Sequence, residues 1–267
     1  MSALRTTLIA CSLTLVTAAS ALAGPPLATD DAGTVDVGAL EVEINGSYAT
    51  DKQRAGGTTC KASAADGEIK ISTGLFTNLS GSLALPYSYS LREKEDGELS
   101  HKTKGLGDLV LEFKYAVTEA AGVRFAIKPM LVMPTGRYSE GLSEGHWHGG
   151  MTLIASKEFA DGQYALHANL GYEHHRYRTH AIKSSTHGNL WAGSVAGEAE
   201  LVKGLVVVAD IGIATNPHKG DHELPVYALT GARYEINELL DINAGVRFGL
   251  TSPETDVTAL YGVVLKF

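Results

Sequence analysis

The stretch Leu240–Leu250, LDINAGVRFGL, alternates apolar and polar residues with a period of two. One set of alternating positions holds Leu240, Ile242, Ala244, Val246, Phe248 and Leu250, and the other holds Asp241, Asn243, Gly245, Arg247 and Gly249. Successive side chains of a β-strand point to opposite faces. The stretch therefore predicts a strand with one apolar face and one polar face.

The same alternation recurs along the chain and predicts twelve strands. They are 38–49, 65–74, 79–91, 107–117, 123–134, 149–159, 163–174, 188–201, 205–214, 225–235, 239–250 and 256–267. Most approach the roughly 9–11 residues that a tilted strand needs to cross a bilayer. The eighth and tenth are rich in Gly and Ala, which leaves their inward and outward faces open.

The connections between these strands alternate between short and long. The short ones are Leu75–Asn78, Thr118–Gly122, Ala160–Gly162, Val202–Gly204 and Ile236–Glu238, and the long ones are 50–64, 92–106, 135–148, 175–187, 215–224 and 251–255. Outer-membrane barrels have short periplasmic turns, longer external loops and an even number of strands. We therefore expect an all-β, antiparallel, up-and-down transmembrane barrel of about twelve strands, with both termini on the periplasmic side.

The N-terminus has the features of an export signal. Arg5 precedes the apolar run Leu8–Val16, and Ala21-Leu22-Ala23 is a small-residue cleavage site. An alternative is lipidation at Cys11, but the stretch before it is short for an apolar signal region. The prediction is a signal peptide at 1–23, a short periplasmic segment at 24–37 and a barrel at 38–267.

Composition agrees with a barrel and argues against a nucleic-acid partner. The formal net charge is −8 and no basic stripe is present. Mean hydropathy is zero, as expected when each strand averages an apolar and a polar face. Aromatic residues cluster near both ends of the predicted strands, which resembles the two aromatic girdles of such barrels; examples are Tyr48, Tyr87, Tyr172, Tyr115, Tyr164 and Phe267.

Several short motifs together resemble one bacterial family. They are PLATDDAGT at 26–34, GLFTNL at 74–79, LALPY at 83–87, GLGDL at 105–109, MPTG at 133–136 and AGVRFGL at 244–250. In this order they resemble the outer-membrane family named for the MetA pathway of phenol degradation. The resemblance implies a barrel that passes small, often aromatic or hydrophobic compounds. The terminal Phe267 also resembles the signal that the barrel assembly machinery reads.

The alternation of inward and outward residues along each strand places charged residues of both signs inside the barrel. There they can set ion and solute selectivity. The candidates for lining the pore are Glu41, Glu43, Lys70, Glu112, Lys114, Arg124, Lys128, Asp210, Asp241 and Arg247. Alternatively, the charges pair across strands and partly fill the lumen. A barrel of eight strands is just filled by side chains, and sixteen or more leave an aqueous channel. We therefore expect a narrow, partly occluded pore.

Histidines gather in or beside the predicted long loops. Because imidazole and carboxylate groups bind Zn or Cu, a metal site at the external mouth is one hypothesis. Its candidate ligands are His146, His148, His174, His175, His218 and His222. The alternative is a set of solvated loop histidines, since their spacing matches no structural zinc motif.

The sequence favours a channel over other classes of function. We find no Ser-His-acid pattern, phosphate loop or dinucleotide fingerprint, so we expect no enzymatic activity. The predicted function is passive passage of small solutes, with outer-membrane lipid as the surroundings. The alternatives are a non-conducting structural or adhesive barrel and a metal-binding barrel.

Overall fold

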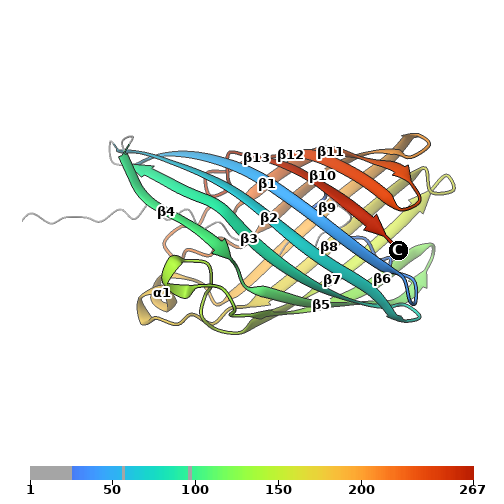
Figure 1. Ribbon diagram of the computed structural model, residues 1–267, viewed down its shortest axis with the longest axis horizontal. Coiled ribbons are helices and arrows are strands. Elements are labelled where there is room, and N and C mark those ends of the chain that lie inside the picture. The colour runs from blue at the N-terminus through green and yellow to red at the C-terminus, as the bar shows by residue number, and fades with distance from the viewer. Residues whose placement is uncertain (1–25, 56–57, 96–97) are drawn as a thin grey trace, which may run out of the picture.

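The computed structural model describes residues 26–55, 58–95 and 98–267, so the predicted signal peptide lies outside the described residues. The described chain forms a closed antiparallel barrel (Figure 1). Its strands are β1 Leu40–Ala55, β2 Thr58–Phe76, β3 Leu79–Glu95, β4 Glu98–Leu106, β5 Leu109–Ala120, β6 Val123–Met133, β7 His148–Phe159, β8 Tyr164–His174, β9 Asn189–Val202, β10 Leu205–Ala214, β11 Val226–Asn237, β12 Leu240–Gly249 and β13 Val257–Lys266. Two short helices are η1 Tyr138–Glu140 and α1 His180–Ser185.

Closure of the sheet confirms the expectation of twelve strands. The last strand pairs with the first, with Val42 opposite Leu265, and β2 pairs with β3 to complete the ring. Strands β4 and β5 both pair with β3 and are separated from each other only by Gly107 and Asp108. They therefore count as one strand of the barrel. Closure is required in lipid, because an open edge would leave backbone groups without hydrogen-bond partners.

The barrel is apolar outside and charged inside. Outward side chains such as Leu153, Leu170 and Ile211 are about half exposed, whereas the inward Lys70 and Lys128 are buried. A soluble protein shows the opposite arrangement, so the outer face is suited to lipid. Among the described residues, neither helix is long and apolar enough to cross a membrane.

The five short turns lie where the sequence predicts them, but two of the predicted long loops are wrong. Residues 50–64 and 92–106 are largely strand, because the β1–β2 and β3–β4 hairpins continue well past the other strands (Figure 1). Beyond the apolar band both faces of a strand can be polar, so pairing continues after the period-two signal has ended. The loops 135–147, 175–188 and 215–225 are mainly irregular and carry η1 and α1.

The location predicted for the N-terminal segment is also wrong. Residues 26–32 lie inside the barrel, where Leu27 and Asp30 are almost completely buried, and do not extend into the periplasm. The chain leaves the barrel beside the turn between β2 and β3, where Val37 bridges Gly74. A Cβ on Gly74 would lie 2.1 Å from the Asp36 carbonyl oxygen, so only glycine allows this close approach.

The outer face gives a direct test of the membrane arrangement. Leu170 lies near the middle of β8 and opposite Leu153, and Leu201 lies beside the turn that ends β9. We expect Leu170→Arg to lower the free energy of unfolding in lipid vesicles by about 2–4 kcal/mol, and the control Leu201→Arg by about 0–1 kcal/mol. Denaturant titration measures both. Equal effects of the two substitutions would contradict the placement of these strands in the bilayer.

Candidate functional site

The centre of the lumen holds a continuous chain of ion pairs. Asp30 Oδ1 is 2.8 Å from Lys114 Nζ, and Asp30 Oδ2 is 2.7 Å from Lys128 Nζ. Lys128 also lies 3.6 Å from Glu112, which lies 3.4 Å from Lys70. Lys70 in turn lies 3.8 Å from Glu43. This series of ion pairs therefore alternates three carboxylates with three ammonium groups. Asp30 is the one member of the series that does not belong to the barrel wall.

Asp30 adds a carboxylate to those of the wall, and it is the one that contacts Lys114 and Lys128 most closely. Without it, Lys70, Lys114 and Lys128 would face only Glu43 and Glu112 within the chain of ion pairs. A buried charge that loses its partner is strongly destabilising, because the remaining ion is kept from water. The lumen wall is thus electrostatically complementary to the N-terminal segment.

A second polar anchor lies at Asp210 of β10. Its carboxylate accepts hydrogen bonds from the backbone N–H groups of Ala28 and Thr29, at 2.9 and 2.8 Å, and from the Tyr227 hydroxyl at 3.1 Å. The Thr29 hydroxyl lies 2.7 Å from Ser194 Oγ and 3.0 Å from Asp210 Oδ1. Hydrogen bonds to an ionised carboxylate are roughly twice as strong as neutral ones. Asp210 therefore fixes the segment at its backbone.

Apolar contacts complete the fit of the segment. Leu27 packs among Ala196, Val208, Tyr227 and Leu229 on the inner face of β9, β10 and β11. Nearby, Gly231 and Gly245 are cross-strand partners, and a Cβ on either would lie about 3 Å or less from Pro26. Glycine at these two positions leaves room for the Pro26 ring.

The third anchor of the segment is Ser156. With His167 and Glu198 it has the residue types of a catalytic triad, but the segment covers its hydroxyl. Ser156 Oγ is 2.8 Å from His167 Nδ1, and His167 Nε2 is 4.0 Å from Glu198. Ser156 Oγ also accepts a 2.8 Å hydrogen bond from the Ala32 N–H, so the segment covers the hydroxyl. Sequence reasoning missed this group because the pattern of 188–201 does not show which of its residues point inward, and Glu198 was therefore not assigned to the lumen.

A polar cavity of about 370 Å³ lies at the end of the lumen that carries the short turns. Lys266 and Asp241 form a 2.7 Å ion pair in its wall, and Arg233 pairs with Glu198 at 3.2 Å. Its other charged lining residues are Glu41, Glu43, Glu200 and Glu235. Acidic residues outnumber basic ones in this wall, so the cavity favours cationic or neutral solutes over anions.

The structure places the predicted pore-lining residues in five different surroundings, and their role in conduction stays a prediction. Glu43, Lys70, Glu112, Lys114 and Lys128 belong to the series of ion pairs that ends at Asp30, where Lys114 and Lys128 make the direct contacts. Asp210 holds the segment, and Glu41 and Asp241 line the polar cavity. Arg124 lies near a short turn, 54% exposed and 3.9 Å from Glu119. Arg247 lies 3.9 Å from the centre of the Tyr227 ring and 2.8 Å from Glu254.

The external mouth brings together two of the six candidate metal-binding histidines. His148 and His175 stack with ring centres 4.3 Å apart, and both lie beside Glu144, which sequence reasoning missed. The other four, His146, His174, His218 and His222, are not part of this group of possible ligands. His174 instead lies 2.9 Å from the Asn189 side-chain oxygen.

His175 is held between two carboxylates. Its Nδ1 is 2.9 Å from Glu144 Oε1, and its Nε2 is 2.8 Å from Glu173 Oε2. Burial lowers the pKa of His175, but the hydrogen bonds and charges of Glu144 and Glu173 outweigh burial and raise the pKa to about 9. At neutral pH the imidazole is therefore protonated and ion-paired.

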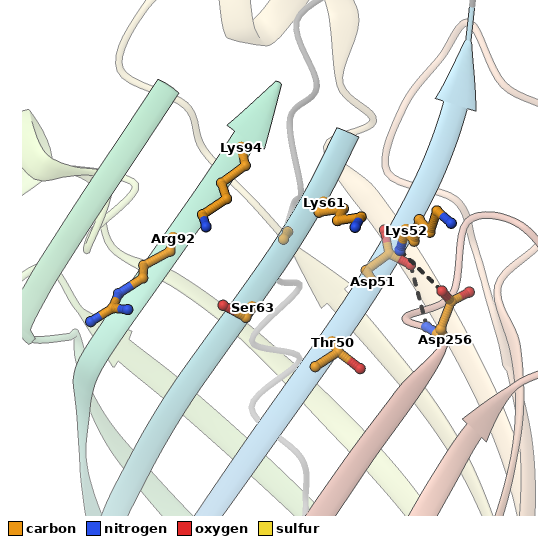
Figure 2. Close-up of a pocket in the computed structure, with 9 residues that line it drawn as sticks. Thr50, Asp51, Lys52, Lys61, Ser63, Arg92, Lys94 and Asp256 are labelled. Carbon is orange, nitrogen blue, oxygen red and sulfur yellow. Dashed lines mark hydrogen bonds between the residues drawn. The ribbon is translucent and has the colours of Figure 1, made fainter. Parts of the chain in front are cut away.

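The extended hairpins carry a basic outer surface. Lys52, Lys61, Arg92 and Lys94 come from β1, β2 and β3 and line one surface depression (Figure 2). Strand parity puts Lys52 on the same face as Tyr48 and Ile44, which is the outer face of the barrel. The cations therefore lie outside the lumen, beyond the aromatic residue Tyr48.

The ion pairs of Asp30 give a testable consequence for the segment. We expect Asp30→Ala to free the segment from the wall, because two buried ammonium groups lose a partner at a cost of about 3–5 kcal/mol. Hydrogen exchange of the Thr29 amide, which is bonded to Asp210, should become faster. Asp31→Asn is the matched control, because Asp31 Oδ1 accepts only the nearby Gly33 N–H in this segment. Unchanged exchange in Asp30→Ala would show that the ion pairs do not hold the segment.

Comparisons with known proteins agree with this architecture. Residues 29–267 match the model of the family described as "Putative MetA-pathway of phenol degradation". Among solved structures, the COG4313 outer membrane channel from Pseudomonas putida F1 is similar, with a TM-score of 0.73 and 16% identity, covering 89% of this chain and 98% of that one. No curated protein sequence matches the chain.

Two further solved structures share the fold at lower similarity. The NanC porin has a TM-score of 0.58 and 10% identity, covering 85% of this chain and 100% of its own. The translocator domain of the autotransporter NalP from Neisseria meningitidis has a TM-score of 0.54 and 14% identity, covering 87% and 90%. At these identities the likeness shows the fold, and a closed barrel of this kind lies in the outer membrane.

Proposed function

The chain belongs to the Putative MetA-pathway of phenol degradation family, and from that premise we propose that it is a passive outer-membrane channel for small solutes. We further propose that residues 26–33 close the lumen and that their displacement opens it. The observation that carries the proposal is the attachment of this segment, which is held by ion pairs, hydrogen bonds and apolar contacts at the centre of the barrel.

The barrel wall supports this proposal because its strands pair with one another without help from the segment. Every neighbouring pair around the ring is joined by its own antiparallel ladder. Displacing the segment would therefore leave the barrel closed and connect the polar cavity near the short turns with the external half of the lumen. Passive flow needs no energy-coupling device.

The wall exposed by this displacement suits solutes with an apolar part. Removing Leu27 would uncover Val208, Leu229 and the Tyr227 ring, next to the Arg247 guanidinium. An aromatic ring could pack on the apolar patch while a polar substituent reaches Arg247 or Asp210. We therefore propose small aromatic or hydrophobic compounds as the solute class, in agreement with the name of the family.

Two further parts of the proposal concern assembly and chemistry. The terminal Phe267 completes the ring by exchanging backbone hydrogen bonds with Leu40, and its side chain remains 66% exposed. We propose that this side chain is read by the barrel assembly machinery. We propose no catalysis, because His167 Nε2 lies 4.0 Å from Glu198, too far for the hydrogen bond that orients the histidine of a catalytic triad.

Removing the segment tests the channel proposal. We expect the mature chain without residues 24–33 to show higher single-channel conductance and faster aromatic-acid flux than the full mature chain in planar bilayers and liposomes. The barrel should still fold, because its ladders do not include these residues. If neither protein passes ions, sugars or aromatic acids, the alternative of a non-conducting structural or adhesive barrel replaces the channel.

Charge reversal on the two faces of the wall tests whether the lumen conducts. In the chain without residues 24–33, Arg247→Glu should shift ion selectivity towards cations, because a carboxylate replaces a guanidinium in the pore. Lys157→Glu is the matched control: it makes the same change on the outer face, where Lys157 lies over the Phe159 ring. Reversal potentials measure both. Identical selectivity of the two variants would mean that Arg247 does not line the conducting path.

A further inference from the structure

Three potential metal ligands meet at the external mouth, away from the segment and the proposed pathway. Glu144 lies in the loop between β6 and β7, His148 begins β7, and His175 directly follows β8. One ligand atom of each lies within 4.8 Å of the other two. Two separate parts of the polypeptide therefore converge here: the end of the β6–β7 loop with the first residue of β7, and the residue after β8.

The separations between these atoms already approach those of a bound zinc ion. Glu144 Oε2 lies 3.4 Å from His148 Nδ1 and 3.0 Å from His175 Nδ1. Ligand atoms at about 2.0–2.1 Å from a tetrahedral Zn²⁺ are roughly 3.3 Å apart. The rings of His148 and His175 are stacked with their centres 4.3 Å apart. Binding would therefore turn at least one ring, so that a nitrogen of each imidazole faces the ion, and would displace the proton that His175 carries when the metal is absent.

The hydrogen bonding of these three residues is more consistent with a bound metal than with a complete hydrogen-bond network among the side chains alone. His148 Nδ1 is buried and has no hydrogen-bond partner among the described residues. His175 Nε2, on the far side of its ring, is 2.8 Å from the Glu173 carboxylate. A ligand histidine usually donates its second N–H to such a carboxylate, which orients the ring and makes the ligand nitrogen more basic.

The loops that carry these ligands are also held in place. Glu144 precedes Gly145, whose φ of +74° is in the left-handed region, and a Cβ there would lie 2.9 Å from the Tyr138 ring. The same ring lies 4.9 Å from the Arg178 guanidinium, which belongs to the loop after β8. This contact joins the two loops independently of the histidines. The ligand geometry is therefore preorganised, as a specific metal site requires.

We propose that Glu144, His148 and His175 form a Zn²⁺ site that joins the loops at the external mouth of the barrel, with Glu173 as a positioning residue for His175. Two imidazoles and one carboxylate are a common ligand set for zinc, and they leave a fourth position for water or another donor. Cu²⁺ is expected to compete, because it binds such nitrogen and oxygen ligands more tightly. The site does not depend on the proposed channel function.

Calorimetric titration of the folded, EDTA-treated mature chain with Zn²⁺ tests the proposal. We expect one ion per chain, and Co²⁺ in place of Zn²⁺ should give the visible absorption bands of tetrahedral cobalt. His148→Ala and His175→Ala should each weaken binding at least about tenfold, and Glu173→Gln about 10–100-fold. His146→Ala, in the β6–β7 loop, and His174→Ala, at the last residue of β8, are matched controls next to the ligands and should bind as the unchanged protein does.

Folding is checked separately, by the shift in electrophoretic mobility on heating, so that a loss of binding is read only from variants that form the barrel. If His148→Ala does not fold, His148→Gln replaces it, because the amide keeps most of the side-chain volume. The proposal is overturned if the unchanged chain binds no Zn²⁺ more tightly than about 1 mM, or if the folded His148 and His175 variants bind as tightly as it does. Either result would mean that Glu144, His148 and His175 join the loops through ion pairs and bind no metal.

Discussion

The Asp30 carboxylate, held between the ammonium groups of Lys114 and Lys128, is the interaction on which the organisation of the lumen depends. Neither lysine could stay buried without an opposite charge, because the penalty of removing an ion from water is offset only by close pairing. The wall supplies part of that charge through Glu112 and the N-terminal segment supplies the rest. The filled lumen is thus a property of the wall and the segment together.

The outer face is constrained by the surrounding lipid. Backbone groups have no other partners there, so the sheet closes through β1 and β13 and the side chains alternate between apolar and polar. Where the chain leaves the apolar band, the alternation ends but the β1–β2 and β3–β4 hairpins continue (Figure 1). His148, His175 and the basic surface of Lys52 and Lys61 lie in these external parts.

Period-two alternation, together with the alternation of short and long connections, was enough to predict the strand number and the closed barrel, because the bilayer imposes both patterns on the chain. The position of residues 26–32 could not be predicted, because this segment has no periodicity and its docking depends on contacts far along the chain, such as Asp30 with Lys128. Glu144 was missed for the same reason. Of the six candidate histidines, His148 and His175 are the two that lie with a third potential ligand, Glu144, among the described residues, and sequence spacing does not show this.

A disulfide between the segment and the wall tests the central claim, that residues 26–33 close the channel reversibly. Thr29 Oγ1 lies 2.7 Å from Ser194 Oγ, so cysteines at these positions are close enough to bond. Cys60 of β2, the one cysteine after the predicted signal peptide, is first replaced by serine so that only the introduced pair can bond. In that background, the Thr29→Cys, Ser194→Cys variant should lose conductance and solute flux when oxidised and regain both when reduced. Equal flux in the oxidised and reduced states would contradict the claim that the segment must move for solutes to pass.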